Sequence, residues 1–289
     1  MRVLITGAGG MVGRALRQQC ESFGDEVLAF DHSSLDISNP ELVELEVHRQ
    51  SPDAIINCAA WTDVDGCERE PERSDAVNAG GPKNLAKAAN AVKAVFVTIS
   101  TDYVFDGYKP EGFYTQDDSP NPISVYGQSK LRGEQQSQLV NPRAIIVRSG
   151  FIFGPGGKNF LSLIPAPLSR SEQVKAISDA WGTPTYAIDL AKRLRELCRL
   201  NEPGIYHVVN EGPGASYQEF AQAAAEDIGA DRSLVKGILS ETLSRPAPRP
   251  RNSRLRCLIS AERGLDPLPF WRDALREYLR SSGLSPSRR

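Results

Sequence analysis

The chain has 289 residues, of which 40% are hydrophobic and 24% are charged, and its formal net charge is −2. This composition excludes an intrinsically disordered chain and a protein that coats a polyanion, because apolar residues are plentiful and positive charge is not in excess. No apolar run approaches the ~20 residues of a membrane span, so we expect no membrane partner.

The cysteines indicate a reducing compartment. They are odd in number, widely separated and include no Cys-x-x-Cys pair, so neither a disulfide framework nor a zinc site is expected. The first apolar run, at residues 2–5, is too short for a secretion signal and is typical of a first strand. We therefore expect a cytoplasmic protein. The five cysteines are Cys20, Cys58, Cys67, Cys198 and Cys257.

The first half of the chain alternates short β-branched runs with amphipathic helical stretches. Near-continuous apolar strands separated by helices predict a parallel sheet covered on both faces, and right-handed crossovers make it a doubly wound, Rossmann-like α/β fold. Ligands bind such sheets at the carboxyl ends of the strands. Strands are predicted at residues 3–5, 27–30, 54–57, 95–99 and 144–147.

Beyond Arg148 the chain becomes richer in glycine and proline, which indicates loops and short helices that close over a site. Residues 205–209 are typical of one more strand of the main sheet, and residues 217–228 of an amphipathic helix. We therefore predict a dinucleotide-binding domain of residues 1–150 and about 183–212. A smaller, discontinuous α/β substrate lobe is predicted for residues about 151–182 and 213–289.

A glycine-spaced turn, Gly7, Gly10 and Gly13, lies between the first strand and the first helix. Glycines allow a tight turn and a close backbone approach, and a helix N-terminus stabilises a diphosphate through its N–H groups and its dipole. We predict that this turn, with Met11 and Val12, binds the diphosphate of a nicotinamide dinucleotide. The alternative is a glycine-rich turn without a ligand.

Asp31 follows the second strand, where a carboxylate can bond the ribose hydroxyls and repel a 2′-phosphate. This favours NADH over NADPH, but Arg14 or His32 could receive a phosphate, and Asp31 could simply be a turn residue. The coenzyme is therefore predicted as NADH or NADPH. Further coenzyme contacts are predicted for Asp36 and Ile37 beside the adenine, and for Ala60, Trp61 and Thr62 on the far side, with core packing as the alternative for Trp61.

Tyr126 and Lys130 are four residues apart on a predicted helix, so their side chains share one face. A phenol with a pKa near ~10 is a poor acid–base group at neutral pH, and an adjacent ammonium lowers that pKa. Thr101 ends the strand at 95–99 and could donate to the same carbonyl oxygen as Tyr126. These three residues are predicted to be catalytic. Tyr126 and Lys130 are also predicted to bind the coenzyme, with Lys130 at the nicotinamide ribose.

Three motifs make a family resemblance specific: residues 6–13, 100–107 and 126–134. The chain resembles the extended short-chain dehydrogenases/reductases and, more narrowly, the dTDP-4-dehydrorhamnose reductase family, over nearly its whole length. The resemblance implies that NAD(P)H reduces the 4-keto group of dTDP-4-dehydro-6-deoxy-L-mannose to give dTDP-L-rhamnose. It also implies that the nucleotide sugar is bound by Thr101, Asp102, Tyr103, Phe151, Asn159, Arg249 and Ser253.

The chain departs from the family pattern at three places, and each departure bears on the prediction. Tyr103 stands where related dehydratases have a proton-abstracting Glu, which favours simple reduction. Phe151 stands where the family often has Trp, so the fit to one particular sugar stays open. Arg14 and Ala15 replace an acidic residue found in relatives with a metal-bridged dimer, so we expect no metal site.

Two other functions remain as alternatives. One is a different nucleotide-sugar reductase or epimerase of the same superfamily. The other is a non-catalytic regulatory subunit resembling that of methionine adenosyltransferase, which the intact set of Thr101, Tyr126 and Lys130 argues against. A nucleic-acid partner is not expected, because the arginine-rich final segment has few stacking aromatic residues. The expected partner is a small-molecule nucleotide sugar, and the expected state is a monomer or homodimer.

Overall fold

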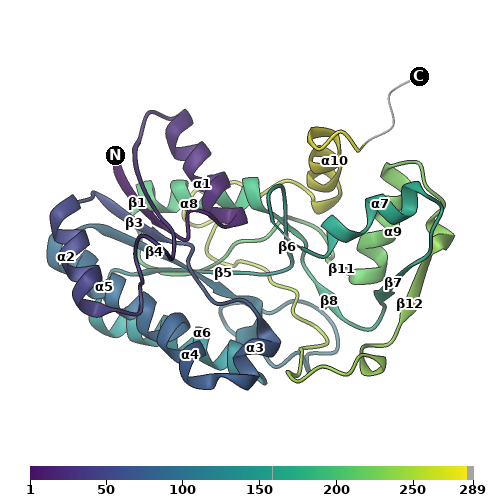
Figure 1. Cartoon of the computed structure of the whole chain (residues 1–289), viewed down its shortest axis with the longest axis horizontal. Helices are drawn as coiled ribbons and strands as arrows, with labels where there is room; N and C mark the ends of the chain where they lie inside the picture. The colour runs from purple at the N-terminus through teal and green to yellow at the C-terminus, as the bar shows by residue number, and fades with distance from the viewer. Residues whose placement is uncertain (158, 285–289) are drawn as a thin grey trace.

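The computed structural model describes residues 1–157 and 159–284, and its largest element is a six-stranded parallel sheet (Figure 1). The strand order is β10-β5-β4-β3-β1-β2. After β1 the chain adds β2 on one side and then returns to add β3 on the other, which places the topological switch point between β1 and β3. The strands are β1 (Arg2–Thr6), β2 (Glu26–Phe30), β3 (Ala54–Asn57), β4 (Val95–Thr101), β5 (Ile145–Ser149) and β10 (Gly204–His207).

Helices cover both faces of this sheet. On one face α1 packs against α8, and on the other α2, α5 and α6 lie side by side. The doubly wound α/β fold predicted from the sequence is therefore confirmed. The helices are α1 (Met11–Ser22), α2 (Pro40–Gln50), α5 (Gly81–Val92), α6 (Val125–Val140) and α8 (Ala187–Leu200).

Local chemistry sets the helix ends. The Asn39 side chain accepts a hydrogen bond from Leu42 N at the start of α2, and Pro40 occupies the first position, where no N–H is needed. Ser124 caps α6 through Gly127 N. The α8 helix stops at Asn201, whose left-handed φ of 53° turns the chain out of the helix.

Between β3 and α5 the chain forms a compact helical segment. Its parts are α3 (Val64–Arg69), α4 (Pro71–Asp75) and one π-helical turn (Ala76–Gly80). Buried Asn78 fastens this segment to the sheet edge, because its amide oxygen accepts from Trp61 N and its amide nitrogen donates to Trp61 O. The segment also packs against α6, the helix that carries Tyr126.

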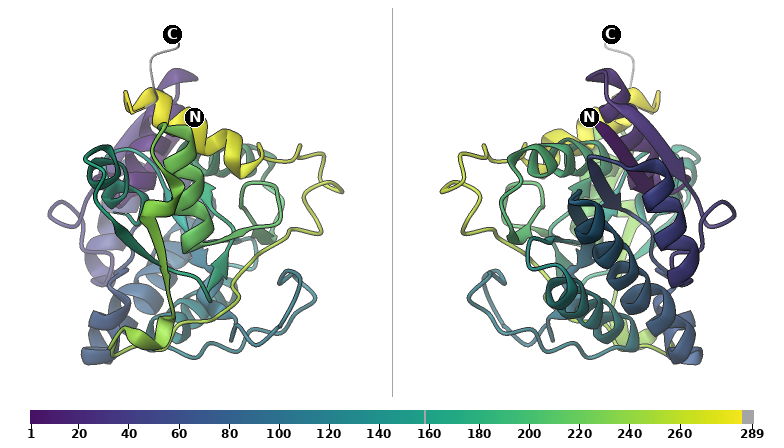
Figure 2. Two further views of the ribbon diagram at one scale, coloured as in Figure 1. Left: turned by 90° about the vertical axis from the view of Figure 1, so that its right-hand side faces the viewer. Right: turned by 90° about the vertical axis from the view of Figure 1, so that its left-hand side faces the viewer.

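The remaining elements form a smaller body, called the lobe here, on the right of Figure 1. Its core is one hydrophobic cluster that includes Phe153, Phe220, Trp271 and Tyr278. Seen from the lobe side, α9 lies in front with α10 above it (Figure 2). The lobe elements are β6 (Ile152–Phe153), α7 (Pro165–Ser169), β7 (Val174–Ile177), β8 (Trp181–Gly182), β9 (Thr185–Tyr186), β11 (Ala215–Ser216), α9 (Tyr217–Asp227), β12 (Val235–Ile238) and α10 (Trp271–Ser281).

The lobe strands pair across long stretches of chain. The β7 and β12 strands pair in parallel, as do β6 and β9, whereas β8 and β11 pair antiparallel. Short 3-10 turns lie at Asp102–Val104, Leu161–Leu163, Arg232–Leu234 and Ser240–Thr242. Among the described helices, none combines the length and the apolar character needed to cross a bilayer.

Candidate active site

A cleft of about 720 Å³ opens between the carboxyl ends of the main-sheet strands and the lobe. A second hollow of about 360 Å³ on the lobe contains none of the predicted site residues, so the expected chemistry belongs to the larger cleft. The cleft brings together predicted residues from six separate stretches of chain. They are Gly10, Met11, Val12, Gly13, Ala60, Thr62, Thr101, Asp102, Tyr103, Tyr126, Lys130, Phe151, Asn159, Arg249 and Ser253.

The glycine turn forms the floor of one end of the cleft. Gly7 has a left-handed φ of 67°, and a Cβ atom on it would lie 2.6 Å from Ala59 N. A Cβ atom on Gly13 would lie 2.2 Å from the carbonyl oxygen of Gly7. The α1 helix begins at Met11 without a side-chain cap, so its first N–H groups are free to receive an anion. The turn thus fits the diphosphate of a dinucleotide.

Five predicted coenzyme residues, Gly7, Asp31, Asp36, Ile37 and Trp61, are not in the lining of this cleft. The Asp31 carboxylate accepts from the amides and hydroxyls of the two serines that follow it, so it shapes its own turn. Ile37 is buried in the core, and the Asp36 carboxylate bonds the next serine. The Trp61 ring lies under the Arg73 guanidinium, 4.4 Å away. Contacts of these five with a coenzyme stay predictions.

The three predicted catalytic side chains all line the cleft. Thr101 is the last residue of β4, and its hydroxyl accepts from Tyr103 N at 3.1 Å. Tyr126 and Lys130 lie on the first turns of α6, and both are buried. The Lys130 ammonium donates to the carbonyl oxygen of Ile99 at 2.7 Å, which fixes it beside the end of β4. Two sequence-distant elements therefore hold the set together.

Burial raises the pKa of Tyr126 above its ordinary value, although the neighbouring Thr101 hydroxyl acts in the opposite direction. The prediction that Lys130 lowers this pKa is wrong for the free protein, because withdrawal from water is the largest influence and Lys130 is not among the groups that shift it. Burial also lowers the pKa of Lys130 to about 8. At neutral pH the phenol keeps its proton, which is the form that a proton donor needs.

A buried ion pair between Glu134 and Arg148 anchors α6 to the sheet. Glu134, one turn after Lys130, accepts from Arg148 Nη2 at 2.7 Å and Nε at 3.0 Å, and also from the Ser100 hydroxyl. Both charged side chains are almost fully buried. The pair joins α6 to β4 and β5, so the position of Tyr126 relative to Thr101 depends on it.

The substrate side of the cleft begins at Asp102. Its carboxyl is buried, and burial raises its pKa to about 6. The absence of a side chain at Gly150 makes room for it, because a Cβ atom there would lie 2.2 Å from Asp102 Cγ. Phe151 then has a left-handed φ of 47°, and its ring packs 4.3 Å from the ring of Tyr217. Strain at a non-glycine residue of this kind is typical of functional sites.

Asn159 and Ser253 both line the cleft. The Asn159 amide donates to the carbonyl oxygens of Gly154 and Gly157, both at 3.2 Å, and so holds the loop that lies over Met11. Ser253 N donates to Trp181 O at 2.8 Å, which anchors the segment after Arg249 to β8. Their contacts to a sugar stay predictions.

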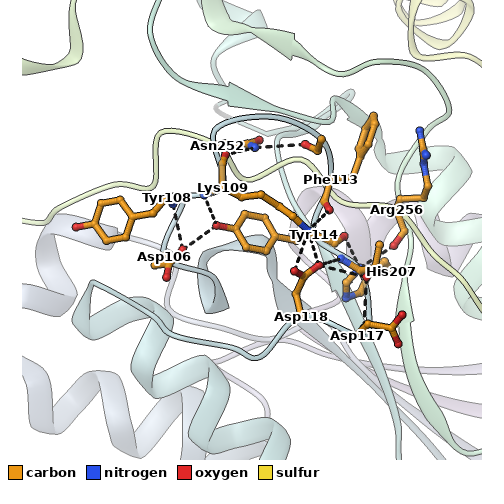
Figure 3. A network of polar contacts seen from close by, with 12 residues as sticks. Asp106, Tyr108, Lys109, Phe113, Tyr114, Asp117, Asp118, His207, Asn252 and Arg256 are labelled. Carbon is orange, nitrogen blue, oxygen red and sulfur yellow. Dashed lines mark hydrogen bonds and ion pairs between the residues drawn. The ribbon is translucent and has the colours of Figure 1, made fainter.

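A polar network fixes the loop at residues 105–118 against the chain at residues 252–256 (Figure 3). Tyr114 lies at its centre and donates to Asp106 at 2.7 Å, while Tyr114 N donates to Arg254 O at the same distance. Lys109 forms an ion pair with Asp118 at 2.8 Å. Asn252 Nδ2 donates to Lys109 O at 2.8 Å, so the network joins the loop that follows Tyr103 to the segment that contains Ser253.

Comparison with known proteins now identifies the family. The family described as "RmlD substrate binding domain" matches residues 1–283. A dTDP-4-dehydrorhamnose reductase of Mycolicibacterium smegmatis is 41% identical over 278 residues, which are 96% of this chain and 84% of that protein. The chain belongs to the dTDP-4-dehydrorhamnose reductase family.

Solved structures of dTDP-4-dehydrorhamnose reductases share the fold. One from Clostridium acetobutylicum is 37% identical with a TM-score of 0.92, and the match covers 98% of this chain and 100% of that one. One from Bacillus anthracis, in complex with NADP, is 34% identical with a TM-score of 0.92 and covers 97% of this chain and 99% of that one. The family resemblance predicted from the sequence motifs is confirmed.

Sequence reasoning missed several residues of the cleft. The sequence predicts Tyr217 only as part of a helix, yet its ring packs on Phe151, and burial raises the pKa of its phenol. Trp181 and Arg245 also line the cleft. Helical periodicity explains Tyr217 as a core residue, so no local signal distinguishes it. Within residues 1–157 and 159–284, no cluster of three or more His, Cys, Asp or Glu side chains could hold a metal ion.

Proposed function

We propose that this protein is an NAD(P)H-dependent oxidoreductase that reduces the 4-keto group of dTDP-4-dehydro-6-deoxy-L-mannose to give dTDP-L-rhamnose. The observation that carries the proposal is the convergence of Thr101, Tyr126 and Lys130 on one cleft whose other end is an uncapped helix N-terminus over a glycine turn. Membership of the reductase family supports the nucleotide sugar as the substrate class.

In this proposal Tyr126 is the proton donor. Bound NAD(P)H supplies the hydride to the carbon of the ketone. The Tyr126 hydroxyl gives its proton to the keto oxygen, so the carbonyl becomes a secondary alcohol and Tyr126 becomes a phenolate. Lys130 stabilises that phenolate by its charge, and Thr101 donates a hydrogen bond to the keto oxygen while negative charge develops on it. Water then returns a proton to Tyr126.

The coenzyme end of the cleft is the end formed by the glycine turn at residues 7–13. The N–H groups of Met11, Val12 and Gly13 would hold the diphosphate, and Ala60 and Thr62, which also line the cleft, would contact the coenzyme. The Asp31 carboxylate already accepts four hydrogen bonds from its own turn, and this supports acceptance of NADPH as well as NADH. The substrate end comprises Asp102, Tyr103, Phe151, Asn159, Arg249 and Ser253.

We also propose a division of labour between two parts of the chain. Residues 1–150 and about 183–212 bind the coenzyme, and residues about 151–182 and 213–289 bind the sugar nucleotide. The separate hydrophobic clusters of the sheet and the lobe support this division for most of the chain. Two places differ from it: Tyr186 packs in the lobe cluster, and residues 257–268 pack against the sheet cluster. Residues 285–289 lie outside the described residues. All five cysteines are free, which supports the proposed cytoplasmic location, and we propose a monomer or homodimer.

The decisive experiment is a turnover assay with two substrates. Oxidation of NADPH and of NADH is followed with dTDP-4-dehydro-6-deoxy-L-mannose and, separately, with dTDP-4-dehydro-6-deoxy-D-glucose, and the products are identified by NMR. The proposal expects turnover of the first sugar to dTDP-L-rhamnose. Turnover of the second sugar alone would assign the chain to a different reductase, and coenzyme binding without any turnover would support a regulatory subunit.

A further inference from the structure

The α3 helix carries an ion pair to a segment far along the chain. Asp65 accepts from Arg249 through both carboxylate oxygens, with Nη1 to Oδ1 at 2.6 Å and Nη2 to Oδ2 at 2.8 Å. The same Oδ1 atom accepts from Ala247 N at 3.1 Å. The 247–249 segment, which belongs to the wall of the cleft, is thus tied to a helix of the coenzyme-binding side. The proposed chemistry gives Asp65 no role of its own.

The pair leaves part of the guanidinium group available. An arginine has five N–H donors. Two on Nη1 go to Asp65 and to Ala247 O at 2.7 Å, and one on Nη2 goes to Asp65. The Nε–H and the second Nη2–H have no acceptor among the residues that the structure describes. Two adjacent N–H donors on one guanidinium edge match two oxygens of a phosphate.

The surroundings place the Arg249 side chain at the substrate end of the cleft. Arg249 lines the cleft together with the half-buried Tyr103 and Tyr217. Burial acts to lower the pKa of Arg249, but its hydrogen bond and charge pairing with Asp65 raise that pKa above its ordinary value. The Arg249 and Asp65 side chains are only 20% and 27% exposed, so water screens the pair incompletely. The Arg249 hydrogen bond lowers the pKa of Asp65 to about 2, so the carboxylate stays charged throughout the neutral range.

We propose that Asp65 is a positioning residue: it holds the Arg249 guanidinium with its free edge toward the cleft, where that edge binds the diphosphate of the nucleotide sugar. This inference rests on the proposed function for the identity of the ligand. The rotamer freedom of an unpaired arginine would otherwise be lost on each binding event. Asp65 removes that cost before the substrate arrives.

If Asp65 had the opposite role, its removal would change substrate affinity in the opposite direction. If Asp65 instead sequesters Arg249 away from the substrate, its removal frees the guanidinium and tightens substrate binding. The sign of the change in KM therefore separates the two roles.

The test compares Asp65→Asn with Asp63→Asn. Asp63 is the N-cap of the same helix, loses the same charge and still caps α3 through Gly66 N as asparagine. Its ion pair is an exposed one with Arg69 at 3.6 Å, whereas the ion pair of Arg249 is with Asp65. For Asp65→Asn we expect the KM of the nucleotide sugar to rise about tenfold, with kcat and the KM of NADPH unchanged. Asp63→Asn should match the wild type. An unchanged or lower sugar KM, or an equal loss in the NADPH KM, overturns the proposal.

A double-mutant comparison guards against a purely structural effect. Once Arg249→Ala has removed the guanidinium, Asp65→Asn should raise the sugar KM no further. An equal rise in that background shows that Asp65 acts without Arg249 and overturns the proposal. If thermal denaturation shows that Asp65→Asn is not folded, Asp65→Glu, which keeps the charge, is tested instead and should retain part of the affinity for the nucleotide sugar. A folded Asp65→Glu protein that has lost this affinity completely also overturns the proposal.

Calorimetric binding of dTDP, which contains the diphosphate but no keto sugar, separates this inference from the proposed function. Weaker dTDP binding by Asp65→Asn supports the positioning role even if the wild type turns over neither sugar. Equal dTDP binding by the two proteins overturns the positioning role even if the wild type is an active reductase.

Discussion

Substituting alanine at Gly13 tests the coenzyme cradle most directly, because the added atom has a defined position. A Cβ atom there would lie 2.2 Å from Gly7 O, 2.8 Å from Ala8 Cα and 2.9 Å from Gly7 C. All three are backbone atoms, so no flexible side chain can move aside. Since Gly13 lies in the first turn of α1, the helix and the Gly7 turn must move apart by roughly 1 Å, and misplacement on this scale can cost ~10²-fold in function.

Two opposing effects set the magnitude for stability. Alanine in a helix is favoured over glycine by about 0.5–1 kcal/mol. Overpacking against fixed backbone costs about 1–3 kcal/mol. The clash should therefore outweigh the helix preference, so Tm should fall by about 2–4 °C. Because the displaced N–H groups are those that would hold the diphosphate, the Kd for NADPH should rise by about 10²-fold.

The assay is calorimetric NADPH binding combined with thermal unfolding, and Gly9→Ala is the matched control. A Cβ atom on Gly9 would have only Asp31 Cβ nearby, at an ordinary 3.8 Å. That variant has the same chemical change in the same turn and should bind NADPH like the wild type. A Gly13→Ala protein with a raised Tm and wild-type NADPH affinity would refute the cradle geometry.

Three further predictions follow from the site. Tyr126→Phe should reduce the reduction rate by roughly 10²–10⁴-fold with NADPH affinity intact, and an unaffected steady-state rate contradicts the proton-donor role. Because burial lowers the pKa of Lys130 to about 8, its charge is lost as pH rises through that value. The ratio kcat/KM should therefore fall above about pH 8, and Lys130→Met should lose this dependence; an unchanged profile in that variant counts against the assignment. Glu134→Gln leaves the Arg148 guanidinium buried without its anion. The free energy of unfolding, measured by urea denaturation, should therefore fall by about 3–5 kcal/mol. A fall of less than about 1 kcal/mol contradicts the supporting role of the ion pair.

Local sequence determined the fold class and the central part of the site. The apolar runs that form β1, β3, β4 and β5 can be recognised locally, because a strand buried on both faces needs a continuous hydrophobic stretch. Gly7 and Gly13 signal the turn because no side chain fits there. Tyr126 and Lys130 share a helix face by their spacing alone, and Thr101 follows a recognisable strand.

Contacts between distant segments could be decided only by the tertiary structure. Asp65 and Arg249 are 184 residues apart, and Tyr217 meets Phe151 only because α9 packs on the start of the lobe. The protonation of Tyr126 depends in the same way on burial, which raises its pKa against the expectation from its lysine neighbour. Side-chain periodicity reports which face of an element is buried, whereas the partner on that face and the water that it excludes are properties of the folded chain.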